Sequence, residues 1–235
     1  MIKKKPASSP LKTSKLEMAE TFARRAHREL RATLLRGEFL PATQLTLRGL
    51  ATRFGTSVMP IREAVSRLAA EHALELRPNR AIRVPDLSRT EIDHLWQIRL
   101  LIESEAAALA AEAADEAHIV TLEEVCKMMW RAHRKGDWRA MVEGTGEWAV
   151  RLAESSGSAP FIDYVSNLRL RCAPHIARAL ASGLVPDDDF FAFSLRIQDQ
   201  IVDAIRRHDA PRARDLRQSD VRTFMDFVYR RLGWD

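Results

Sequence analysis

The residues with the clearest chemistry are arginines on one face of a predicted helix that Ser57 can cap. The apolar residues of this helix recur at i, i+3, i+4, i+7 and i+8, which predicts one narrow buried stripe: Ile61, Ala64, Val65, Leu68 and Ala69. The outward face carries Val58, Met59, Arg62, Ser66 and Arg67. A guanidinium near the start of such a helix can donate two parallel hydrogen bonds to a base edge in the major groove of DNA. We therefore expect Arg62 to contact a base.

The N-terminal part of the chain is strongly basic. Residues 1–85 hold 17 Lys and Arg against 7 Asp and Glu, a net charge of +10, whereas residues 86–235 hold 20 against 25, a net charge of −5. This division favours a nucleic-acid-binding module joined to a second module. Phosphate contacts are expected from the other arginines of the region: Arg48, Arg53 and Arg67. A solvated basic surface is the alternative, above all for Arg53 and Arg67.

Enzyme motifs are not found in the sequence. It contains no G-x-S-x-G, no P-loop, no G-x-G-x-x-G and no H-E-x-x-H, so we expect the protein not to be an enzyme. Cys126 and Cys172 form neither a disulfide framework nor a zinc-binding spacing. No run of 18 apolar residues and no signal peptide are present, which predicts a cytoplasmic protein that does not enter a membrane.

The elements that would position these arginines follow the order of a winged helix-turn-helix over residues 16–85. A helix is expected from Leu16 to Arg36, and Gly37 stands at its C-cap. After the turn 38–44, Thr46 can cap a short helix that Gly55 ends, and the helix capped by Ser57 follows. Residues 74–84 then alternate as two short strands about a Pro-Asn turn. Residues 1–15 are predicted to be a disordered basic tail.

The remainder, residues 86–235, is predicted to be an all-helical domain after a short linker at 85–88. Its apolar spacing and its breakers predict six helices over 90–113, 116–134, 137–155, 160–182, 187–207 and 210–232. Short loops between long helices favour an antiparallel bundle. The fold class expected for the whole chain is therefore mainly α, with one small β-hairpin.

The stretch from Leu45 to Leu68, LTLRGLATRFGTSVMPIREAVSRL, resembles the signature of the GntR family of bacterial regulators. The matching positions are Gly55, Ser57, Pro60, Arg62, Glu63, Ala64 and Leu68, and the run Arg77-Pro-Asn-Arg80 is similar to the wing of the family. The resemblance implies a homodimer on a palindromic double-stranded operator. It also implies Arg62 on a base and the wing tip, with Arg80 and Ala81, in the minor groove.

This sequence departs from the family pattern at three positions that would meet DNA. The usual Arg and Thr of Ser-Arg-Thr-Pro are replaced by Val58 and Met59, and the usual wing glycine is replaced by Ala81, which adopts a left-handed backbone less easily. The departures predict either an unusual operator or weakened DNA binding. We favour the unusual operator, because Arg62 and the helical scaffold are retained.

The second half resembles the FCD ligand-binding domain of the FadR branch of these regulators. The similarity lies in the opening run 95–103, LWQIRLLIE, and in the closing run 201–214, IVDAIRRHDAPRAR. The resemblance implies a helical bundle that dimerises and binds a small metabolite, in our interpretation an organic acid or an acyl compound. The residues expected to face this effector are Arg99, Thr145, Trp148, Gln198 and Asp220. Arg99 either meets an anionic effector or pairs with Glu103 one turn away.

Many FCD domains hold a divalent metal with one aspartate and three histidines. Those positions fall on Thr145, Ala149, Gln198 and Asp220 here, of which Asp220 alone is a good ligand for a first-row metal. We therefore predict no metal and no other cofactor. Together these features predict a DNA-binding transcriptional regulator, a repressor controlled by a metabolite. A winged-helix scaffold that contacts protein, with weakened DNA binding, is the alternative.

Overall fold

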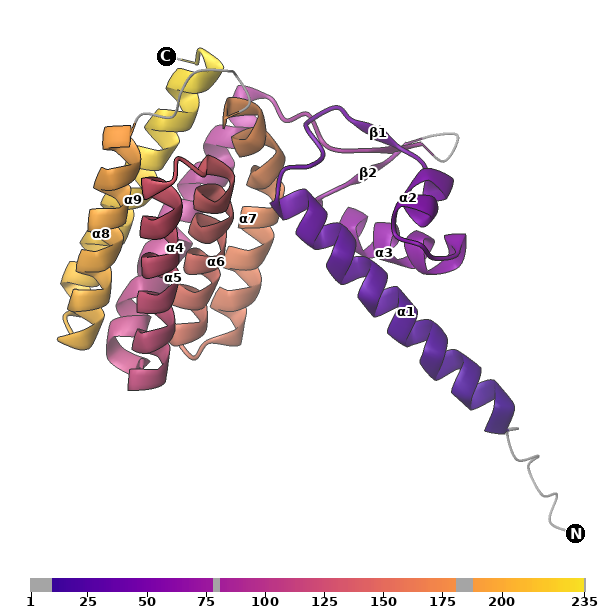
Figure 1. Cartoon of the computed structure of the whole chain (residues 1–235), viewed down its shortest axis with the longest axis horizontal. Coiled ribbons are helices and arrows are strands. Elements are labelled where there is room, and N and C mark those ends of the chain that lie inside the picture. The colour runs from indigo at the N-terminus through magenta and orange to yellow at the C-terminus, as the bar shows by residue number, and fades with distance from the viewer. Residues whose placement is uncertain (1–9, 78–80, 181–187, 235) are drawn as a thin grey trace, which may run out of the picture. The chain divides into compact units, whose positions relative to one another are not determined.

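Figure 1 shows the computed structural model of the chain, which describes residues 10–77, 81–180 and 188–234. It divides into two compact units. The first unit comprises the chain up to Thr33 together with Ala42–Pro85, and the second comprises Leu34–Pro41 together with Asp86–Asp235. None of the helices searched within the described ranges is both long and apolar enough to cross a membrane.

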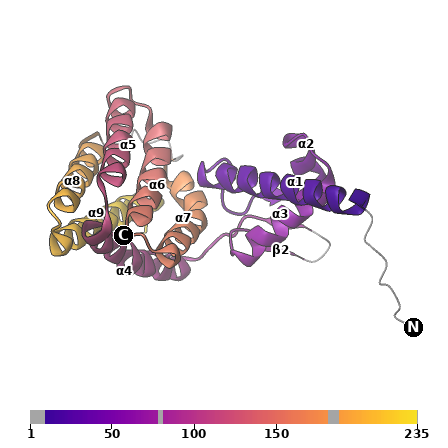
Figure 2. The same ribbon diagram turned by 90° about the horizontal axis from the view of Figure 1, so that it is seen from below.

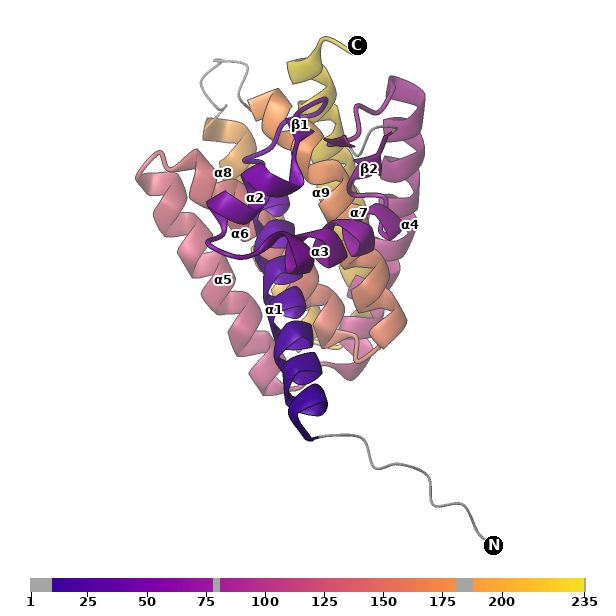
Figure 3. The same ribbon diagram turned by 90° about the vertical axis from the view of Figure 1, so that its right-hand side faces the viewer.

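The first unit is a small helical domain with a short sheet. Its elements in chain order are α1 (Pro10–Leu35), β1 (Gln44–Leu45), α2 (Leu47–Arg53), α3 (Val58–Ala70), β2 (Glu75–Leu76) and β3 (Ile82–Arg83). The strand order is β1-β3-β2 and both pairs are antiparallel, so Leu45 and Leu76 each lie opposite Ile82. Helices α2 and α3 pack together (Figure 3). This is the winged helix-turn-helix expected from the sequence.

The turns around α2 and α3 follow from their polar and glycine residues. Thr46 caps α2 as predicted, because its hydroxyl accepts a hydrogen bond from the Gly49 amide at 3.0 Å. Gly55 follows α2 with a φ of +60°, which a glycine adopts without steric cost. Ser57 occupies the N-cap position of α3, but its side chain accepts no hydrogen bond there. The predicted position of the cap is confirmed, and the predicted capping bond is absent.

Two features of the first unit differ from the sequence-based expectation. Helix α1 begins at Pro10, so residues 10–15 belong to a helix rather than to the predicted disordered tail, and residues 1–9 lie outside the described ranges. Strand β1 was not predicted, because two residues are too few to show an alternating pattern. It forms where Gln44 pairs with Arg83 of β3, a contact between residues far apart in the sequence.

The second unit contains the six helices expected from the sequence, with ends that differ from the prediction by at most two residues in the described ranges. They are α4 (Arg89–Ala113), α5 (Glu116–Arg134), α6 (Trp138–Ser155), α7 (Ala159–Leu180), α8 (Asp188–Arg206) and α9 (Ala210–Leu232). Helix α4 contacts α6, α7, α8 and α9, most extensively α9, and Figure 2 shows it between α7 and α9. Residues on α4 can therefore reach most of the interior of the bundle.

Short polar side chains fix where these helices begin. Ser88 and Glu91 form a reciprocal capping box at the start of α4, in which each side chain bonds the backbone amide of the other residue. The N-cap residues of α5, α6 and α9 are Asp115, Asp137 and Asp209. Each of these side chains accepts a hydrogen bond from a backbone amide in the first turn of its helix. The bundle surrounds one large apolar core that includes Trp96 and Trp148, both almost fully buried.

Candidate nucleic-acid interface and buried ligand site

Helix α3 has one buried and one exposed face. Pro60 and four residues of the predicted stripe are buried: Ile61, Ala64, Val65 and Leu68. The fifth residue of the predicted stripe, Ala69, is only half-buried. On the opposite face Met59, Arg62, Ser66 and Arg67 are exposed and Val58 is half-buried. The exposed face is therefore the one predicted from the sequence to meet DNA.

Three arginines of the helix-turn-helix have free guanidinium groups. Arg48 lies on α2, and Arg62 and Arg67 lie on α3. All three are exposed, and none of them makes a hydrogen bond or an ion pair with another described residue. Because no acidic neighbour neutralises them, their charges are available to an external polyanion.

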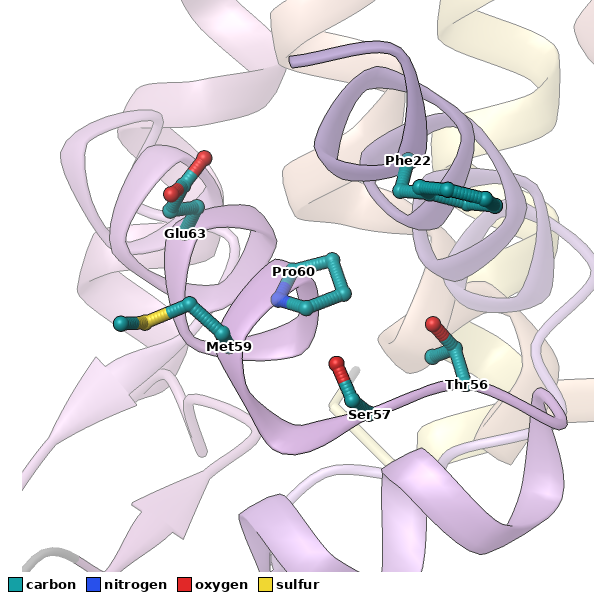
Figure 4. A pocket seen from close by; sticks show the side chains of 6 residues that line it. All are labelled: Phe22, Thr56, Ser57, Met59, Pro60 and Glu63. Carbon is teal, nitrogen blue, oxygen red and sulfur yellow. The ribbon is translucent and has the colours of Figure 1, made fainter. Parts of the chain in front are cut away.

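A small apolar hollow lies beside the start of α3 (Figure 4). It has a volume of about 320 Å³ and is lined by Phe22, Thr56, Ser57, Met59, Pro60 and Glu63. Phe22 and Met59 are 53% and 65% exposed, which is unusual for side chains of this size. The two residues thus present apolar surface beside the N-terminal end of α3. This is the end that a recognition helix directs toward base edges.

The wing is described on both sides of its tip. Arg80 lies in the stretch 78–80, outside the described residues. The Arg77 amide donates to the Ala81 carbonyl at 2.9 Å, which holds the two arms together. Among the described non-glycine residues a positive φ occurs at Ala42, His72 and His208, and therefore not at Ala81. Alanine in place of the usual glycine thus causes no backbone strain at this position.

A group of charged side chains lies inside the bundle, and we call Arg99, Glu103, Arg217 and Asp220 the buried charge cluster. Each of them is at most 3% exposed. Arg99 donates to Glu103 at 2.6 Å within α4, and Arg217 of α9 bridges Glu103 and Asp220. The Ser194 hydroxyl of α8 donates to the second oxygen of Asp220 at 2.8 Å. Three helices are therefore joined by ion pairs and hydrogen bonds that water hardly reaches.

The electrostatics of the cluster are dominated by its cations. Burial alone would raise the pKa of Glu103, but Arg99, Arg217 and Arg169 outweigh it and lower this pKa to about 2. Arg169, on α7, is 6% exposed and has its pKa lowered to about 9, first by burial and then by repulsion from Arg99. Positive charge is thus in excess around Arg169.

The structure places the five predicted effector residues in the interior of the bundle. Arg99 pairs with Glu103, which is the intrahelical alternative raised from the sequence. The Thr145 hydroxyl donates to the Met141 carbonyl at 2.8 Å, and the Arg217 guanidinium lies 5.1 Å from the centre of the Trp148 ring. Gln198 is 1% exposed, and its Oε1 accepts no hydrogen bond from any described residue. The contacts of these five side chains with other described residues do not join the five into a single closed pocket.

The positions that hold a metal in many FCD domains correspond here to residues that do not fit a metal. The Asp220 carboxylate is held by Arg217 and Ser194, and Thr145 uses its hydroxyl within its own helix. Gln198 and Ala149 supply no imidazole. Within the described ranges, no three His, Cys, Asp or Glu side chains are grouped as a metal ion would require. Arg217 thus lies against the carboxylate that would be the best metal ligand.

Sequence reasoning missed three polar residues of this region: Arg169, Ser194 and Arg217. Only weak signals marked them. Arg217 stands three residues before Asp220, and Arg169 lies in the run LRLRC, where alternating arginines on a helix normally point to solvent. Their burial depends on helices that are distant in the sequence, so periodicity within one helix cannot reveal it.

Two family models match the chain. The model for the FCD domain matches residues 94–222, which is 129 of the 235 residues, and the model for bacterial regulatory proteins of the gntR family matches residues 22–84. The chain belongs to the GntR family of bacterial regulators. It has the FadR-type arrangement of an N-terminal helix-turn-helix and a C-terminal FCD domain, and the relatives that it matches include helix-turn-helix transcriptional regulators.

Individual relatives agree with this assignment. The chain is 27% identical over 146 residues to the HTH-type transcriptional regulator McbR of Escherichia coli, which covers 62% of this chain and 66% of McbR. It is 30% identical over 135 residues to the HTH-type transcriptional repressor GlaR of Escherichia coli, which covers 51% of this chain and 61% of GlaR. The chain thus spans somewhat less than two thirds of the length of these curated relatives.

Solved structures share the fold of this GntR-family regulator. The structure of Escherichia coli McbR/YncC superposes with a TM-score of 0.83 at 22% identity, covering 90% of this chain and 98% of the other. Lar, which controls the expression of the Listeria monocytogenes agr system, superposes with a TM-score of 0.58 at 17% identity, covering 88% and 96%. At these identities the likeness establishes the fold alone.

Proposed function

We propose that this GntR-family regulator is a cytoplasmic repressor that binds a palindromic operator as a homodimer and is released by a small metabolite bound in its FCD domain. The observation that carries the DNA-binding part is the exposed face of α3. It presents Arg62 and Arg67 without ion-pair partners, beside Arg48 of α2. A repressor named GlaR among the relatives supports repression rather than activation.

Arg62 is proposed to read a base and Arg48 and Arg67 to hold phosphates. Arg62 is exposed in the second turn of α3, which is the position from which recognition helices reach base edges. Val58 and Met59 stand where the family usually has an arginine and a threonine, so these two contacts to DNA are replaced by apolar ones. We therefore propose an operator that differs from those of relatives at the bases facing Val58 and Met59.

The effector is proposed to bind inside the bundle without a metal. Support comes from the buried charge cluster and from the unbonded Gln198 Oε1, since buried polar groups in a protein core are normally hydrogen-bonded. An effector that bonds such groups would stabilise one arrangement of the bundle helices. Through a change in that helix arrangement, effector binding would alter the dimer and its affinity for DNA.

DNA binding is tested with the full chain and a fluorescent duplex carrying the region upstream of its own gene. The Kd should rise steeply between 50 and 200 mM salt, because each phosphate contact releases counterions. Arg62→Ala should lose about 5- to 150-fold in discrimination between the operator and an unrelated duplex. Arg67→Ala is the matched control and should weaken both duplexes alike. No binding even at the lowest salt would favour the alternative, a winged-helix scaffold that contacts protein.

A further inference from the structure

We propose that Met59 selects thymine in the operator by packing against the C5-methyl group of that base in the major groove. This inference rests on the proposed function, since it names the base that one residue of α3 recognises. It goes beyond the loss of the usual family contacts at positions 58 and 59, because it gives the apolar replacement a recognition role of its own.

Met59 is a long apolar side chain that α3 presents to solvent. It is the second residue of the helix and is 65% exposed, whereas the next residue, Pro60, is buried. Figure 4 shows the Met59 side chain extending away from Phe22 and Thr56, and the hollow that these residues line lies beside it. The thioether chain is therefore free to contact a molecule that approaches this end of α3.

Met59 shares the outward face of α3 with Arg62. The two residues are three positions apart, which places them on the same side of a helix, and both are exposed. A helix rises about 1.5 Å per residue, so the two positions lie about 4.5 Å apart along its axis. Successive bases of one strand are about 3.4 Å apart, so the base that meets Met59 lies within about two base pairs of the base that Arg62 reads.

The major groove offers one apolar group to such a side chain, the C5-methyl group of thymine. The edges of the other bases present hydrogen-bond donors and acceptors. The Met59 thioether is only a weak acceptor, so packing it over those edges would remove water without replacing the hydrogen bonds. Packing it over the methyl group removes two apolar surfaces from water. Met59 therefore favours thymine through the contact that it makes and through the cost of the alternatives.

The charges around Met59 suit DNA better than an apolar protein surface. Arg62 and Arg67 of α3 and Arg48 of α2 are exposed and have no partner among the described residues. Helix α3 contains one acidic residue, Glu63, so its net charge is positive. A protein surface packed on Met59 would take these cations out of water, whereas a duplex brings phosphates to them.

The first experiment uses a duplex that the full chain selects from a randomised pool. Each thymine of its half-site is replaced in turn by deoxyuridine, which lacks only the methyl group. At one thymine near the base read by Arg62, the Kd of the wild type should rise about 4-fold, as expected for one methyl group that is no longer buried. A half-site without thymine there, or no loss at any thymine, would overturn the proposal.

The second experiment assigns the methyl contact to Met59. Met59→Ala should bind the thymine duplex and the deoxyuridine duplex with the same Kd, because the side chain that senses the methyl group is gone. Met59→Leu is the matched control, since it keeps a large apolar side chain and should still distinguish the two duplexes. Both variants should melt at the wild-type temperature, because position 59 is exposed. An equal loss in Met59→Ala and the wild type would show that another residue or the DNA shape reads the methyl group.

The third experiment separates the methyl group from the hydrogen-bonding groups of thymine. The thymine–adenine pair is replaced by cytosine–guanine and then by 5-methylcytosine–guanine, which restores the methyl group alone. The wild type should bind the methylated duplex about 4-fold more tightly than the unmethylated one, and Met59→Ala should bind both alike. Equal affinities of the wild type for the two duplexes would overturn the proposal.

Failure of this inference and failure of the proposed function can be told apart. If the full chain selects no duplex and binds none at low salt, the proposed DNA-binding function falls, and the role of Met59 falls with it. If a selected duplex is bound in a manner that depends on Arg62 but not on any methyl group, only the role of Met59 is overturned.

Discussion

Arg217 is the side chain on which the internal charges of the bundle converge. It reaches Glu103 of α4 and Asp220 of α9, and its guanidinium also lies 5.1 Å from the centre of the Trp148 ring of α6. A buried ion pair is a weak source of net stability, because both charges lose their hydration. Removing one partner is different, since it leaves the others charged and unpaired. Arg217 thus connects α9 with α4 and holds the carboxylates of Glu103 and Asp220 in place.

Arg217→Ala should therefore destabilise the bundle by about 3–5 kcal/mol. Urea unfolding followed by tryptophan fluorescence measures the change, because Trp96 and Trp148 lie in this core. The matched control is Arg214→Ala, one turn earlier in α9. Arg214 pairs with Glu105 at 2.8 Å, but both side chains are more than 40% exposed, so its loss should cost less than about 1 kcal/mol. Similar losses for the two variants would contradict the role given to Arg217.

Glu103 should make the stability of the bundle depend on acid pH. Its pKa is lowered to about 2 in the folded protein from an ordinary value of 4.5, so the ionised carboxylate favours folding. This contribution is complete above pH 4.5 and is lost as the pH falls toward 2. It is on the order of 3 kcal/mol, and Glu103→Gln should remove this part of the acid dependence. An unchanged dependence of the urea midpoint on pH in the variant would contradict it.

At the scale of elements, the helices were predictable because their signals are local. Thr46, Ser88 and Asp209 each precede a helix by one residue, and apolar spacing within each helix marks its buried side. Strand β1 and the extension of α1 to Pro10 were not predictable in this way. The strand depends on pairing with β3. The sequence Ser9-Pro10 is typical of a helix start, but the residues that follow it have no regular apolar spacing.

The recognition helix α3 allows a test at the same scale. The double substitution Val58→Arg and Met59→Thr restores the residues usual in the family on a helix whose buried side is unchanged. Selection from a randomised duplex pool should then yield a different half-site from that of the wild type. The added cation should also steepen the salt dependence of DNA binding by about one counterion. Identical selected half-sites would mean that positions 58 and 59 do not face bases.

At the scale of the whole molecule, the chain divides its charges between its two units. The DNA-binding unit leaves Arg48, Arg62 and Arg67 without partners on its surface, whereas the bundle leaves Arg169 without a partner in its interior. The surface arginines could be predicted from apolar spacing within two short helices, α2 for Arg48 and α3 for Arg62 and Arg67. The internal one could not, because its burial requires α7 to pack against helices from distant parts of the sequence. For the same reason the fold class and the exposed face of α3 follow from the sequence, while the buried charges of the bundle do not.

The bundle should reach full stability without a metal ion. At the positions that bind metal in many FCD domains, Asp220 is held by Arg217 and Ser194, and Thr145 and Gln198 offer no imidazole. Dialysis against EDTA should therefore leave the melting temperature unchanged, and elemental analysis of protein purified without chelator should find far less than one metal ion per chain. Added Zn²⁺ or Ni²⁺ gives a positive check, since a vacant site would respond to it with a higher melting temperature. One tightly bound ion per chain, or a loss of stability in EDTA, would show that Asp220 leaves Arg217 to ligate a metal, and the assignment of the cluster as a metal-free site would fall.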